Sequence, residues 1–201
     1  MRILIVIPII HTQQDMGALL ELTRQTYVAR YGQEKWAEHI KAIDQVWSGI
    51  RQMIEALTLP FASLRIYQDG LPLCGNEADI VRDVADRGSP NHQILLELMA
   101  QGAQLMGTED PNLLLQEYHL HKNTLADANK TDECQSKILL SARDQFIAER
   151  INSTLMTGEV GLLFLGMAHQ VEPLLNTDIY CGPLSQDNNV SSLRWLPVSC
   201  S

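Results

Sequence analysis

Five side chains that can bind metal ions or transfer protons stand directly behind apolar segments of this sequence. Two are imidazoles and three are carboxyl groups: His11, Asp69, Glu109, Asp110 and His169. Imidazole and carboxylate together can bind a divalent metal ion, or act as a base and the group that orients it. Each residue alone also has an ordinary interpretation, because Asp69-Gly70 is a good turn dipeptide and Asp110-Pro111 can begin a helix.

An arginine within an apolar helical stripe adds a sixth group. Over residues 132–157, Arg143 falls near the middle of a face formed by Leu139, Leu140, Phe146, Ile147, Ile151 and Leu155. A buried guanidinium without a partner is costly. Either Arg143 reaches a carboxylate, or its stem is buried and its head group reaches water. Asp144 and Glu149 lie off the centre of the stripe and are expected in solvent.

A second helical segment carries Glu117 and His121 four residues apart. This spacing can place two metal ligands on one helix face. The pattern H-E-x-x-H is absent, so we expect an exposed helix surface instead.

The segments that would position these groups alternate between strand and helix patterns. Strands are predicted at residues 2–10, 61–70, 103–111, 159–170 and 178–184. Helices are predicted over 13–57 with a break in 31–36, over 75–88 and 89–102, and over 111–157 with an interruption near 122–132. Pro8 argues against a central position for the first strand, because proline cannot donate a ladder hydrogen bond; the alternative is that Pro8 marks where the strand ends.

This alternation predicts an α/β fold with a mostly parallel central sheet flanked by helices. We expect one domain over residues 1–201, with a loop-like tail from about 185. Ligands in such sheets gather at the carboxyl ends of the strands, where the five side chains are expected.

The composition excludes several classes of partner. The 201 residues are 45% hydrophobic and carry a net charge of -9, without a basic cluster, which disfavours nucleic acids and anionic membrane surfaces. No apolar stretch approaches about 18 residues, so no membrane-spanning helix is expected. The four cysteines lack C-x-x-C spacing and are expected as reduced thiols. We predict a cytoplasmic protein with a small-molecule or peptide substrate, and leave a homo-oligomer open.

Four short motifs occur in a characteristic order: "PIIH" at 8–11, "YQDG" at 67–70, "RDQFIAERI" at 143–151 and "GMAH" at 166–169. This order resembles the superfamily that joins TraB, Tiki, erythromycin esterase and the haem-binding ChaN proteins. Pro8 stands where the first motif of that superfamily has glycine, and Asp69 stands where it has glutamate.

The resemblance implies an erythromycin-esterase/ChaN-like fold with a pocket lined by His11, Asp69, Arg143 and His169, and with Glu109 as a further candidate. In a metal-assisted hydrolase, His11, Asp69, Glu109 and His169 would hold a divalent ion. In a metal-free hydrolase, His11 would act as base, and Arg143 would orient a carboxylate or stabilise negative charge.

Two alternatives to a hydrolase stay open. One is a small-molecule-binding, haem-binding or regulatory protein without catalysis, although haem is less favoured than a metal ion. The other is an interaction protein whose polar groups are all satisfied internally.

Overall fold

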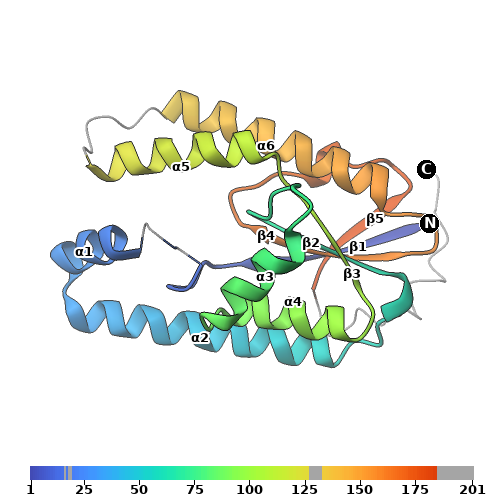
Figure 1. The fold of residues 1–201 in the computed structure, drawn as a ribbon, viewed down its shortest axis with the longest axis horizontal. Coiled ribbons are helices and arrows are strands. Elements are labelled where there is room, and N and C mark those ends of the chain that lie inside the picture. Colours follow the sequence, from blue (N-terminus) through green and yellow to red (C-terminus); the bar gives the residue numbers. More distant parts are fainter. Residues whose placement is uncertain (16, 18–19, 127–132, 185–201) are drawn as a thin grey trace, which may run out of the picture.

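A parallel sheet between two helical layers forms the framework of the protein (Figure 1). The computed structural model describes residues 1–15, 17, 20–126 and 133–184. Within these ranges the sheet order is β3-β2-β4-β1-β5, and every strand pair is parallel. The strands are β1 (Arg2–Ile9), β2 (Leu64–Gln68), β3 (Gln104–Met106), β4 (Val160–Gly166) and β5 (Ile179–Pro183). The predicted α/β fold with a parallel central sheet is therefore confirmed.

The two faces of the sheet are covered by different helices. Helices α2 (Gln33–Glu55), α3 (Glu77–Asp86) and α4 (Pro90–Ala100) contribute to one buried cluster, which includes Ile3, Ile5 and Ile7 of β1. Helix α6 (Glu133–Thr154) packs on the opposite face against Leu4, and α5 (Pro111–Ala126) lies beside α6 (Figure 1). Since successive residues of a strand point to opposite faces, β1 contributes to both layers and is apolar from Ile3 to Ile9.

Strand β1 is central although it contains Pro8, so the expectation that proline would exclude it from the interior was wrong. The amide of Arg2 donates toward the β5 side, to Asp178, whereas the amide of Ile3 donates toward the β4 side, to Glu159. Alternation puts residue 8 on the β5 side. The last residue of β1 that pairs with β5 is Val6, so Pro8 costs the sheet no ladder hydrogen bond.

The helix boundaries follow local signals. The predicted break between α1 (Leu20–Tyr31) and α2 falls at Gly32, whose φ is 90°. Ser89 caps α4 by accepting a hydrogen bond from the His92 amide. Helix α1 begins later than predicted, because residues 12–15 form a turn in which Asp15 accepts from Thr12.

Other predicted segments are shorter in the structure than in the sequence pattern. A 3-10 turn, η2 (Phe61–Ser63), occupies the start of the segment predicted as the second strand. The predicted tail, 185–201, lies outside the described residues, as does the second half of the predicted helix interruption, 127–132. Over the described part of the chain, no helix combines the length and apolarity needed to cross a membrane.

Candidate functional site

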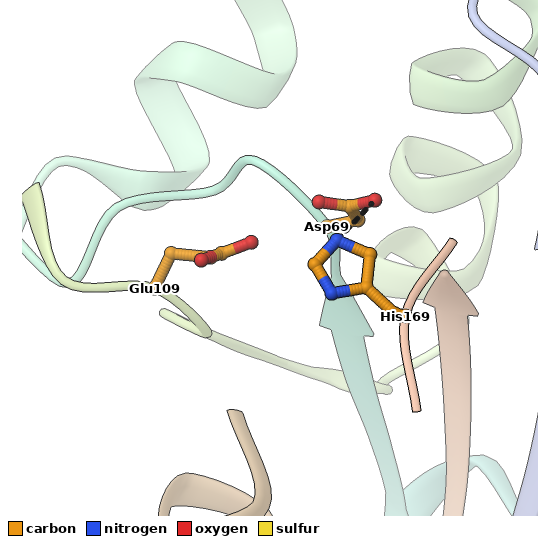
Figure 2. Close-up of side chains that lie close together, drawn as sticks. All are labelled: Asp69, Glu109 and His169. Atoms are coloured by element: carbon orange, nitrogen blue, oxygen red, sulfur yellow. Dashed lines mark ion pairs between the residues drawn. The ribbon is translucent and has the colours of Figure 1, made fainter. Parts of the chain in front are cut away.

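Three of the side chains predicted at the sheet edge converge. Asp69 follows β2, Glu109 follows β3 after two residues, and His169 follows β4 after a short turn. Figure 2 shows the three side chains directed toward a common point. One oxygen or nitrogen atom from each lies within 4.8 Å of the others. The parallel sheet brings them together, because adjacent strands end at the same edge.

Asp69 is fixed by the backbone of the neighbouring strand. Its amide donates to the carbonyl oxygen of Phe164 at 2.9 Å, and its Oδ2 accepts from the Gly166 amide at 2.9 Å. A Cβ at position 166 would lie 2.8 Å from that oxygen. The glycine of "GMAH" therefore permits the close approach of the Asp69 carboxylate, and the same turn orients His169, whose amide donates to the Gly166 carbonyl.

Glu109 is placed by a short extension of the sheet. An isolated parallel bridge pairs it with Pro72, and its backbone exchanges hydrogen bonds with Leu71 and Leu73. Its side chain is fully buried, and Oε1 accepts from the Gly70 amide at 3.2 Å. On α6, Arg150 donates to the Gly107 carbonyl and holds the same loop against the helix.

Arg143 reaches the carboxylates, which confirms the first of its two predicted alternatives. Its Nη2 donates to Asp69 Oδ1 at 2.7 Å and to Glu109 Oε1 at 2.5 Å, and its Nε donates to Glu109 Oε2 at 3.0 Å. Its Nη1 donates to Glu117 of α5. All three guanidinium nitrogens are therefore engaged by carboxylates, and the residue is only 4% exposed.

Asp144 is buried at the site, so the prediction that it lies in solvent was wrong. Its Oδ1 lies 2.5 Å from Nδ1 of His169, and its Oδ2 accepts from the Gln170 amide at 3.0 Å. Asp144 shares the buried stripe of α6 with Ala148 and Ile151, at spacings of four and seven residues. The stripe is rotated away from Phe146, which is half-buried, and toward Asp144.

The predictions for Glu117, His121 and Asp110 have different outcomes. Glu117 is part of the cluster and was missed, because its α5 helix meets Arg143 only through tertiary packing. His121 is exposed, as predicted. Asp110 is a helix cap, since its Oδ1 accepts from the Asn112 amide at 2.7 Å at the start of α5.

His11 is not one of the converging residues. It follows β1 with an exposed side chain, and within the described ranges it is not among the groups that converge with Asp69 and Glu109. Its predicted catalytic role remains a prediction.

The carboxylates around His169 favour the protonated form of its imidazole. Burial alone would lower the pKa of His169, but contacts with Asp69 and Asp144 outweigh burial and raise that pKa above its usual value. Burial would raise the pKa of Asp69, but His169 and Arg143 hold it well below the usual range. Burial raises the pKa of Glu109, and the nearby Asp69 carboxylate acts in the same direction, against Arg143.

Comparison with known proteins adds no relative. No protein-family model, curated protein or solved structure matches the chain.

A cavity adjoins the cluster on the α6 side of the sheet. Its volume is about 540 Å³, within the range of roughly 300–1,000 Å³ typical of small-molecule sites. Its walls come from β1, β4, β5 and the segment around η4 (Glu172–Leu174), and His169 is one of the lining residues. The imidazole thus connects a buried ionic cluster with a space large enough for a ligand.

The cluster does not fit a resident divalent ion well, although Asp69, Glu109 and His169 offer suitable donor atoms. The Nη2 atom of Arg143 already bridges the two carboxylates. A second cation between them would meet the positive guanidinium at close range. The arrangement is better suited to proton transfer by an imidazole held between two carboxylates.

Proposed function

We propose that this protein is a metal-free hydrolase in which His169 transfers protons by general acid–base catalysis. The observation that carries the proposal is the position of His169, between Asp144 and Asp69 and at the wall of the cavity. A carboxylate on one imidazole nitrogen orients the ring and stabilises its protonated form, so that the other nitrogen can exchange a proton with the reactants.

The exchanging atom is Nε2, because Nδ1 is engaged by Asp144. Nε2 lies 3.5 Å from Oδ2 of Asp69. One water molecule can lie within hydrogen-bond distance of both atoms at this separation. In the proposed reaction its oxygen bonds to the acyl carbon, the carbonyl π electrons move to the carbonyl oxygen, and one of the water protons moves to Nε2; the carbonyl re-forms when the tetrahedral intermediate collapses. That proton then passes to the leaving group as its bond to the acyl carbon breaks, which regenerates the neutral imidazole.

Arg143 has a positioning role in this scheme. Its three nitrogens all donate to carboxylates, and Arg143 is not among the residues that line the cavity. It fixes Asp69 and offsets the repulsion between Asp69 and Glu109. Of the two roles that the family resemblance implies for Arg143, orientation of a carboxylate is the one that these contacts support.

The test is turnover of a panel of neutral carboxylic esters, lactones and amides by the wild-type protein and by His169→Gln. Loss of general acid–base catalysis costs about 10²–10⁴ in rate, so we expect a fall in kcat/KM of at least 100-fold. His121→Gln is the matched control, since that imidazole is exposed on α5. His11→Gln tests the second predicted histidine and is expected to retain activity.

Circular dichroism and thermal melting show whether each variant folds. Turnover by a folded His169→Gln protein at the wild-type rate would eliminate the proposal. Activity that is lost on dialysis against a chelator, and restored by a divalent metal, would replace the metal-free scheme with the metal-assisted one.

A further inference from the structure

The cavity beside His169 is mostly apolar. Most of its walls come from the sheet face that packs against α6 and from the η4 segment, including Val6, Leu163, Leu165, Val171 and Leu175. Burying an apolar group against such walls is favourable by about 25 cal/mol for each Å² removed from water. Its occupant should therefore present an apolar surface.

The charge around the cavity narrows the class of occupant. Among the described lining residues, none is Lys or Arg, and Glu172 is the carboxylate of the wall. Burial raises the pKa of the Cys181 thiol to about 11, so this group is neutral near pH 7. The four carboxyl groups around Arg143 and His169 add further negative charge. An anionic ligand would lose hydration here without gaining a free cationic partner, because Arg143 and the imidazole of His169 are already paired with these carboxylates.

We propose that the cavity holds the apolar acyl group of a neutral carboxylic ester, with the scissile carbonyl at His169, and that it rejects acyl groups that carry a carboxylate. The substrate assignment rests on the proposed hydrolase function. Occupation of the cavity by a neutral apolar ligand does not, and it can be measured separately.

Binding is measured with N-phenyl-1-naphthylamine, a neutral apolar dye whose fluorescence rises in apolar surroundings. Cys181→Trp places an indole in the cavity, because residue 181 lines it. Tyr180→Trp is the matched control, since residue 180 is the preceding position on β5, is 46% exposed and does not line the cavity. We expect Cys181→Trp to weaken dye binding at least tenfold and Tyr180→Trp to leave it unchanged.

A second variant tests the cavity if Cys181→Trp does not fold. Leu175 is half-buried in the wall, so Leu175→Lys adds a cation whose head group can reach solvent. We expect this variant to weaken binding of the neutral dye and to reduce discrimination against a carboxylate-bearing acyl group.

Substrate class is measured with p-nitrophenyl esters. From butyrate to hexanoate, we expect kcat/KM to rise about tenfold, because each buried methylene contributes about 0.8 kcal/mol. The hemisuccinate, which ends in a carboxylate, should react at least tenfold more slowly than butyrate. Both preferences should weaken in Cys181→Trp.

The two proposals fail in different ways. Absence of dye binding, or equal binding by folded Cys181→Trp and Tyr180→Trp, would overturn the cavity assignment whatever the enzymatic activity. Dye binding that responds to Cys181→Trp, without hydrolysis of any ester, would leave the ligand cavity standing and reject the hydrolase. Hydrolysis with equal rates for hemisuccinate and butyrate would overturn the substrate class alone.

Discussion

Replacing Arg143 by methionine tests whether the ionic cluster holds the sheet edge together. The substitution keeps an unbranched side chain of moderate length and removes the positive charge. It leaves Asp69 and Glu109 buried beside each other, with side-chain exposures of 5% and 0%. Removing one partner of a buried ion pair costs about 3–5 kcal/mol, because the remaining charges lack compensation. That is a large part of the roughly 5–15 kcal/mol that stabilises a typical domain.

The destabilisation should depend on pH. In the wild-type protein the pKa of Asp69 is lowered, so its stabilising contribution is present above the unfolded value of about 3.9 and is lost as the pH falls. In Arg143→Met the guanidinium is absent, so burial and the nearby Asp69 carboxylate raise the pKa of Glu109 without opposition from Arg143. Protonation then relieves the repulsion, so the penalty should shrink by about 1 kcal/mol or more between pH 7.5 and pH 5.

Urea denaturation followed by circular dichroism at both pH values measures this effect. Arg82→Met is the control, because Arg82 pairs with Asp79 on the exposed surface of α3 and should cost less than about 1 kcal/mol. Adding Glu109→Gln to Arg143→Met should restore at least about 1 kcal/mol, since one of the unpaired charges is removed. A penalty equal to that of Arg82→Met, or one that is the same at both pH values, would refute the reasoning.

Two further predictions concern the turn after β4. Gly166→Ala should destabilise the protein by about 1–3 kcal/mol and reduce turnover, because its Cβ would lie 2.8 Å from an Asp69 oxygen that is held in place. Thermal melting measures the loss of stability. Gly49→Ala is the control, because a Cβ at position 49 would meet no atom within 4 Å, and this substitution should be neutral or stabilising. The free energy of unfolding should fall as the pH rises from about 6.5 through the raised pKa of His169, since the protonated ring is the form that the carboxylates stabilise. Urea titrations from pH 6 to 9 should show this slope in the wild-type protein, and a slope that persists in His169→Gln would assign it to another group.

Much of the site could be predicted because a strand can be recognised from the pattern of a few consecutive residues. The apolar runs that became β1, β2 and β4 are short, continuous and bounded by polar or turn residues. Once they are parallel, the residues behind them must share an edge, which is why Asp69, Glu109 and His169 were found in advance. Pro8 misled the sequence reasoning because its effect depends on how far β5 extends along β1.

Asp144 and Glu117 were missed for a different physical reason. The rotation of an amphipathic helix about its axis is set by all its neighbours, so a stripe drawn through Phe146 points slightly away from the true buried face. The spacing of Asp144, Ala148 and Ile151 was the signal that could have corrected it. No local pattern connects Glu117 to Arg143, since the two residues meet only where α5 packs beside α6.

By itself, the sequence determined the alternation of strands and helices and, through it, which side chains stand at the carboxyl edge. These properties follow from backbone geometry and from burial patterns within a few residues. Only the tertiary structure decided that Arg143 joins carboxylates from three separate segments, that Asp144 holds His169, and that an apolar cavity opens beside that imidazole. Those features depend on which distant segments of the chain pack against one another, and local sequence patterns do not specify that packing.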